Sequence, residues 1–204
     1  MVDMGTGGGE LLLALVQGLG NKVPHSIYAT EAWEANIPVA RKCLEPPGIT
    51  VVPFTEDSRL PLGGESQFDL AINKHESFDP VELRRILQPR ATFLTQQVGG
   101  HDLLEINEAL GSPPPEYSEW SLEAAVQGLE KNVFNIERAE EAIVETRFAG
   151  VGALVGFLHI IDWQVPGFSV ENYRDPLRTM HQRIQDNGPL IAHGYRFLIQ
   201  ATRY

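Results

Sequence analysis

Glycines at alternate positions open the chain, and an acidic residue follows 22 residues after the last of them. The run is Asp3-x-Gly5-x-Gly7-x-Gly9, and the acid is Glu31. Glycine accepts positive φ and lets a ligand approach backbone amides without a Cβ in the way. A carboxylate can accept hydrogen bonds from both hydroxyls of a ribose. Together these features predict a binding site for a nucleoside-bearing cofactor.

The residue after the last glycine indicates which kind of cofactor fits. Dinucleotide sites space their glycines as Gly-x-Gly-x-x-Gly, so that a pyrophosphate can rest on the helix N-terminus. The third glycine of that pattern is replaced here by Glu10, whose carboxylate would repel a pyrophosphate. Asp3, at the start of the run, suits a positively charged amino group. Both residues favour a zwitterionic cofactor without phosphates.

Short β-branched runs alternate with helical stretches, as expected for βαβ units around a parallel sheet. The expected strands are Met1–Met4, Ser26–Thr30, Ile49–Pro53, Phe68–Ile72, Thr92–Val98, Val133–Ala139 and Arg196–Thr202. The expected helices are Glu10–Leu19, Glu34–Leu44, Pro80–Leu87, Leu103–Leu110, Leu122–Lys131, Val151–Ile161 and Val170–Asn187. In a doubly wound sheet this order places the glycine turn beside Glu31, at the point where the strand order reverses.

The length of 204 residues suits a single domain. We expect residues 1–110 to form the cofactor-binding core. Residues 111–204, which begin with the stiff segment Gly111–Pro115, are expected to complete the sheet and cap it within the same domain.

Charge and composition exclude several classes of partner. The formal net charge of -11 disfavours binding to nucleic acid or to anionic membranes. The longest apolar runs are shorter than the roughly 20 residues that span a bilayer. The single cysteine, Cys43, excludes an internal disulfide and fits a cytoplasmic location. We expect a small-molecule substrate, and a homodimer is left open.

The segment Val2–Glu10 resembles motif I of the class I S-adenosylmethionine-dependent methyltransferases. Asp69–Asn73 is similar to the fourth strand of that family, and Leu87–Phe93 is similar to its segment before the fifth strand. The resemblance covers residues 2–110. The stretches Asn73–Glu76 and Trp163–Pro166 further resemble a little-characterised methyltransferase subgroup of bacteria and fungi.

This resemblance implies a doubly wound, Rossmann-like, mostly parallel α/β sheet of seven strands. It also implies transfer of a methyl group from S-adenosylmethionine to an unidentified small molecule. By the resemblance, Asp3, Gly5, Gly7 and Gly9 shape the methionine and ribose side of the pocket, and Glu31 holds the ribose. Glu56 and Asp57 fall where the family contacts the adenine, and Asn73 falls at the methionine part. Family members usually have helices and a full first strand before motif I, and we interpret this lead-in as missing here.

Methyl transfer requires a nucleophile aligned with the methyl group and, if that nucleophile is protonated, a base. His75 and Glu76 directly follow the fourth expected strand. Since histidine titrates near neutrality, we predict His75 as the general base with Glu76 beside it; a histidine that packs within the loop is the alternative. His101 and Asp102 form a similar pair, but neither pair has the spacing of helical metal ligands, and we expect no metal.

Two other functions stay open. A nicotinamide-dependent oxidoreductase could use a related fold, although Glu10 argues against a pyrophosphate. A binding domain that has kept the fold but lost turnover is the second alternative, and the missing lead-in favours it.

Overall fold

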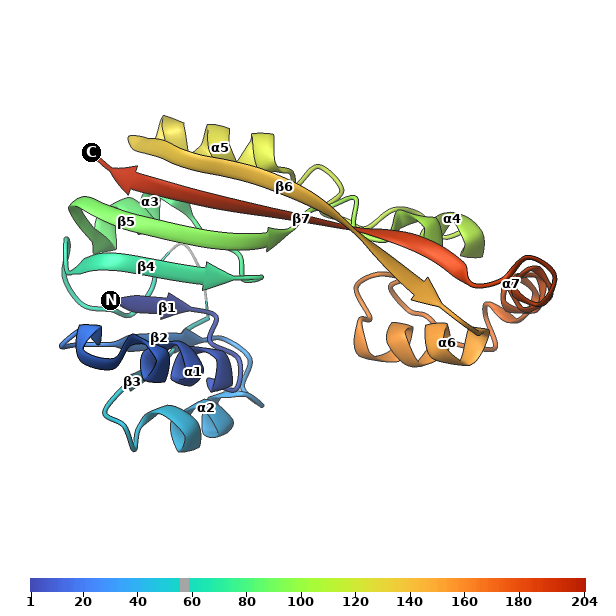
Figure 1. Cartoon of the computed structure of the whole chain (residues 1–204), viewed down its shortest axis with the longest axis horizontal. Coiled ribbons are helices and arrows are strands. Elements are labelled where there is room, and N and C mark those ends of the chain that lie inside the picture. The colour runs from blue at the N-terminus through green and yellow to red at the C-terminus, as the bar shows by residue number, and fades with distance from the viewer. Residues whose placement is uncertain (56–58) are drawn as a thin grey trace. The chain divides into compact units, whose positions relative to one another are not determined.

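In the part of the chain that the structure describes, residues 1–55 and 59–204, seven strands form one sheet in the order β3-β2-β1-β4-β5-β7-β6. Figure 1 shows this arrangement in the computed structural model. The strands are β1 (Val2–Met4), β2 (Tyr28–Glu31), β3 (Thr50–Pro53), β4 (Phe68–Lys74), β5 (Leu87–Val98), β6 (Phe134–Phe148) and β7 (Leu190–Arg203). The helices are α1 (Glu10–Leu19), α2 (Ile37–Leu44), α3 (Pro80–Ile86), α4 (Leu104–Leu110), α5 (Leu122–Lys131), α6 (Val151–Ile160) and α7 (Arg174–Asn187), and a short 3-10 helix, η1, spans Gly20–Lys22.

The first five strands pair in parallel, with β1 between β2 and β4. Figure 1 shows β7 running in the opposite direction to β5. β1 is short, but all three of its residues are buried, which gives it the environment of a central strand. The predicted doubly wound, mostly parallel sheet is therefore confirmed.

One face of the sheet is covered in part by α1 and α2. Asp3 pairs with Ala29 and Ile72, and Ala29 pairs with Val51, so these four side chains share that face. The buried cluster beneath the two helices consists of Met1, Leu12, Ile27, Ala29, Ala40, Leu44, Ile49 and Val51. Because Asp3 lies on the α1 face, its carboxyl group is on the same side of the sheet as the helix that follows the glycine turn.

The strand β5 begins at Leu87, five residues earlier than predicted. Its pairing with β4 passes from Phe68 opposite Leu87 to Leu70 opposite Thr92, which marks a bulge in β5. Arg90, within this bulge, has a φ of 67°. The preceding helix, α3, ends at Ile86, three residues before Pro89. Because a proline is compatible with a bulged strand, the extended backbone starts before it.

The two late strands are also longer than predicted. In β7 the buried positions are 190, 192 and 194, and then 197, 199 and 201, so the alternation changes phase within the strand. In β6 most residues between 135 and 147 are exposed and many are charged, so neither face carries an apolar signal. A strand is predicted from a period-two pattern of apolar residues. The pattern is interrupted in β7 and absent in β6, which explains why these two strands were predicted too short.

The chain forms two compact units. The first comprises Met1–Gln97, Ala125–Glu140 and Leu198–Tyr204, and the second comprises Val98–Ala124 and Glu141–Phe197. In the second unit α4, α6 and α7 pack around buried residues that include Ile106, Leu154 and Met180. No helix in the described part of the chain is both long enough and apolar enough to cross a membrane.

Candidate functional site

The glycine turn joins β1 to α1, and its three alternate glycines have φ angles of 70°, 62° and 89°. A Cβ on Gly5 would lie 2.4 Å from the Cβ of Glu76, and a Cβ on Gly9 would lie 2.7 Å from Cγ of Leu44. A Cβ on Gly7 would have no atom within 4 Å. The first and third glycines are therefore closely packed, whereas the backbone at Gly7 is open to a ligand.

Replacing these glycines one at a time should separate stability from ligand binding. Gly9→Ala combines a left-handed backbone with a clash against α2, and we expect it to lower the free energy of unfolding by about 2–4 kcal/mol. Gly7→Ala adds only backbone strain, about 1 kcal/mol, but places a methyl group where a ligand would approach. Chemical denaturation of both variants measures the difference. Equal losses of stability would contradict the packing role of Gly9.

Glu31, the last residue of β2, lies against the glycine turn. Its Oε2 accepts a hydrogen bond of 2.6 Å from the backbone N–H of Gly7, and its Oε1 accepts one of 2.8 Å from that of Trp33. The backbone N–H of Thr6 also donates to the carbonyl of Thr30 at 2.9 Å. Glu31 is buried, with 3% of its surface exposed, and each of its carboxylate oxygens has a second acceptor position beside the hydrogen bond to the backbone.

Asp3, in β1 just before the turn, supplies a second carboxylate. The residue is only 8% exposed. Burial raises the pKa of Asp3 to about 6; the nearby charge of Glu31 adds to this shift, and the neighbouring Thr6 hydroxyl partly opposes it. A cationic group bound beside Asp3 would stabilise the charged form that burial disfavours.

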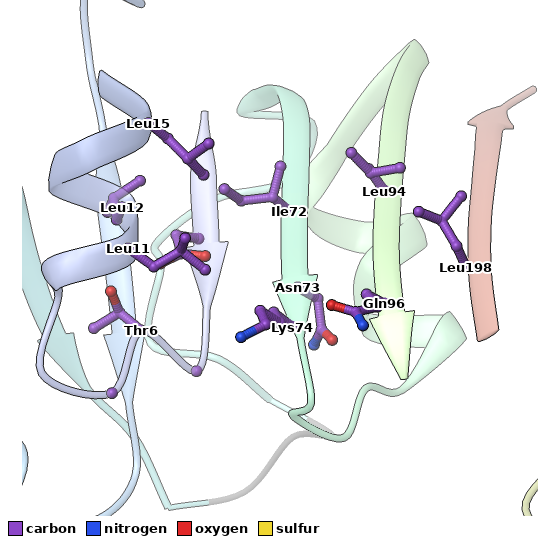
Figure 2. A pocket seen from close by; sticks show the side chains of 13 residues that line it. Thr6, Leu11, Leu12, Leu15, Ile72, Asn73, Lys74, Leu94, Gln96 and Leu198 are labelled. Atoms are coloured by element: carbon purple, nitrogen blue, oxygen red, sulfur yellow. The ribbon is translucent and has the colours of Figure 1, made fainter. Parts of the chain in front are cut away.

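A cavity of about 510 Å³ lies beside the glycine turn, between α1 and the C-terminal halves of β4 and β5 (Figure 2). Its polar lining residues lie near the turn and the strand ends and are Asp3, Thr6, Asn73, Lys74 and Gln96. Its apolar lining residues are Leu11, Leu12, Leu15, Ile72, Leu94 and Leu198. The volume lies within the range of small-molecule sites, and so does the combination of an apolar wall with few polar groups.

Asn73 lines this cavity, but its side chain belongs to a buried hydrogen-bond network. Its Oδ1 accepts from Oγ1 of Thr95 at 3.0 Å and from Nε2 of Gln97 at 2.7 Å. Nε2 of Gln97 also donates to the backbone carbonyl of Glu76 at 2.9 Å, and Nδ2 of Asn73 donates to that of Ser77 at 3.3 Å. The network thus fixes the loop after β4 to the end of β5.

The predicted catalytic pair lies in that loop and does not line the cavity. His75 has a φ of 62°, and its backbone N–H donates to the carbonyl of Gln96 at 2.9 Å. Glu76 packs against Gly5, next to the cavity. Glu56 and Asp57, expected at the adenine, lie outside the described residues. The catalytic roles of His75 and Glu76 and the adenine contacts stay predictions.

Lys74 and Gln96 line the cavity, and of these two Lys74 was not predicted as a site residue. They lie opposite each other in β4 and β5, on the same face as Ile72 and Leu94. Their position depends on the pairing register of two strands far apart in the sequence. The available signal was the alternation along each strand, which places Lys74 and Gln96 on the face opposite Asn73.

Asp102, of the second pair weighed for metal binding, takes part in structural contacts. Oδ1 of Asp102 accepts a hydrogen bond of 2.8 Å from the backbone N–H of Tyr195 and forms an ion pair with Arg196. Within residues 1–55 and 59–204, no three His, Cys, Asp or Glu side chains are grouped as metal ligands are. Asp102 therefore joins the start of α4 to β7 within the second unit.

No protein-family model matches the chain, and no curated protein matches it significantly. Solved structures do match. A candidate methyltransferase from Bacillus halodurans is 15% identical, with a TM-score of 0.68 over 99% of this chain and 91% of that one. A SAM-dependent methyltransferase from Aquifex aeolicus is 17% identical, with a TM-score of 0.57 over 100% and 81% of the two chains. The [4+2]-cyclase SpnF is 16% identical, with a TM-score of 0.58 over 99% and 74%.

These likenesses show that the chain has the fold of the class I SAM-dependent methyltransferases. Because a cyclase has a similar fold, the fold alone does not select methyl transfer. The activity has to be argued from the residues at the glycine turn and the cavity.

Proposed function

We propose that this chain binds S-adenosylmethionine and transfers its methyl group to a small-molecule acceptor. The observation that carries the proposal is the 2.6 Å hydrogen bond between Glu31 and the backbone of Gly7. It joins an acidic residue at the end of β2 to the glycine turn after β1, beside a cavity of suitable size. The shared fold supports the same cofactor class.

The residues around the turn fit this cofactor group by group. Gly7 has an open backbone, and Glu31 has spare acceptor positions for ribose hydroxyls. Asp3 is a buried carboxyl group suited to an ammonium. The carboxylate of Glu10 lies against Gly8, because a Cβ on Gly8 would be 2.5 Å from Oε2 of Glu10. A negative charge therefore lies at the helix N-terminus, where a phosphate would rest. This position of Glu10 favours S-adenosylmethionine over a nicotinamide dinucleotide.

When bound, S-adenosylmethionine supplies a methyl group on a sulfonium, which an electron-rich acceptor atom can attack. The role of the protein is then to orient the two reactants and to exclude water. The leucines of α1, together with Ile72 and Leu94, would contact the apolar body of an acceptor and displace water from this wall. His75, in the loop after β4, remains the proposed base for an acceptor that must lose a proton.

Calorimetric titration with S-adenosylhomocysteine tests the cofactor assignment. We expect 1:1 binding, and no change in NADH fluorescence when NADH is mixed with the protein. A folded sample that does not bind S-adenosylhomocysteine would refute the proposal, and binding of NADH in its place would favour an oxidoreductase. Formation of S-adenosylhomocysteine from S-adenosylmethionine with a panel of acceptors then distinguishes a transferase from a domain that only binds.

A cytoplasmic location is also proposed. The chain has one cysteine, Cys43, which is only partly exposed. A reducing compartment suits a chain without an internal disulfide, and fractionation of the native cells would test the location.

A further inference from the structure

Asp3 and Lys74 lie on the same face of two adjacent strands. Asp3 of β1 pairs with Ile72 of β4, and Lys74 follows Ile72 by two residues. Because side chains alternate along a strand, Ile72 and Lys74 point to the same face as Asp3. Both charged residues line the cavity beside the glycine turn. Figure 2 shows the Lys74 side chain directed from β4 toward the side on which Thr6 lies.

These are the two charged groups among the lining residues of the cavity, and they have opposite signs. Among the residues that the structure describes, the side chain of Lys74 has no ion-pair or hydrogen-bond partner, and Asp3 forms no ion pair with a cation. The two groups therefore do not neutralise each other. A cavity that presents an anion and a separate cation is complementary to a zwitterion.

We propose that Asp3 and Lys74 together bind the amino acid end of the cofactor, with Asp3 on its ammonium and Lys74 on its carboxylate. This inference rests on the proposed function and adds Lys74 as a residue that determines cofactor specificity. Lysine donates hydrogen bonds and carries a positive charge, which are the properties that a carboxylate requires. The remaining cavity wall consists mainly of leucines and an isoleucine, and offers no other cation to the carboxylate.

Three ligands separate the contribution of each charge. S-adenosylhomocysteine carries both the ammonium and the carboxylate, its decarboxylated analogue carries only the ammonium, and 5′-methylthioadenosine carries neither. We expect Lys74→Met to weaken S-adenosylhomocysteine about tenfold, and to change the affinity for the other two ligands less than about twofold. Asp3→Asn should weaken both ligands that carry the ammonium. Isothermal titration of the full chain measures all of these affinities.

Lys74→Arg keeps the charge and should restore most of the affinity for S-adenosylhomocysteine. Lys42→Met removes an exposed lysine from α2, away from the lining of the cavity, and serves as the matched control. An unchanged affinity of Lys74→Met for S-adenosylhomocysteine would overturn the inference, as would an equal loss for all three ligands. If the parent chain binds none of the three, the proposed function fails and the inference fails with it, whereas a failure confined to Lys74 leaves cofactor binding intact.

Discussion

Replacing Glu31 with alanine should weaken the binding of S-adenosylhomocysteine by about 100-fold or more, because two or more hydrogen bonds to a charged acceptor are lost. The carboxylate holds the backbone N–H groups of Gly7 and Trp33, and we propose that it also accepts the ribose hydroxyls. The substitution removes a ligand contact and loosens the turn at the same time. Isothermal titration gives the affinity, and circular dichroism shows whether the variant is folded.

Two further variants keep this prediction testable if Glu31→Ala is unstable. Glu31→Gln retains one acceptor oxygen and should show a loss between those of the parent and of the alanine variant. Glu34→Ala removes an exposed glutamate three residues further along the chain and should change neither affinity nor stability. If folded Glu31→Ala binds within about threefold of the parent, the ribose role of Glu31 is wrong.

The glycine turn and Glu31 could be predicted because their chemistry depends on local spacing. The three alternate glycines, the helix that follows them and the acid at the end of the next strand all fall within the first 31 residues. The conformation of Gly5, Gly7 and Gly9 bears out the expectation of positive φ. No long-range contact had to be known to infer that a turn of this kind is open to a ligand.

The cavity wall depends on contacts that no local pattern contains. Lys74 and Gln96 meet there because β4 and β5 pair in one register, and a shift of β5 by one residue would turn Gln96 to the other face of the sheet. Such a shift would also remove Asn73 from its bonds with Thr95 and Gln97. This buried network therefore helps to set the register that places Gln96 opposite Lys74, although the sequence indicates Asn73 only as a cofactor contact.

The length of β7 could not be predicted from the sequence for a different reason. Prediction of a strand rests on alternating burial, and β7 changes phase between residues 194 and 197. At this point Asp102 accepts a hydrogen bond from the backbone of Tyr195 and pairs with Arg196. The contact depends on a residue almost one hundred positions earlier in the chain, so the local sequence of β7 contains no signal for it.

Binding of S-adenosylhomocysteine should tighten about tenfold as the pH rises from 5 to 7, because the ammonium of the ligand requires an ionised Asp3. Burial is the main reason that the pKa of Asp3 is raised to about 6. In the free protein Asp3 is therefore mostly neutral at pH 5 and mostly charged at pH 7. A bound cation lowers this pKa, so binding releases a proton below pH 6 and the affinity levels off above it. Titrations at constant ionic strength measure the profile.

Asp3→Asn should bind more weakly than the parent at pH 7 and show little change in affinity with pH. The affinity of the parent for 5′-methylthioadenosine, which has no ammonium, should also be flat. Asp3→Asn should remain folded. Because burial raises the pKa of Asp3, its ionisation destabilises the native state increasingly as the pH rises from the unfolded pKa of 3.8 to about 6. A neutral asparagine does not have this cost. An equally steep profile in Asp3→Asn would assign the titration to another group and contradict the contact between Asp3 and the ammonium.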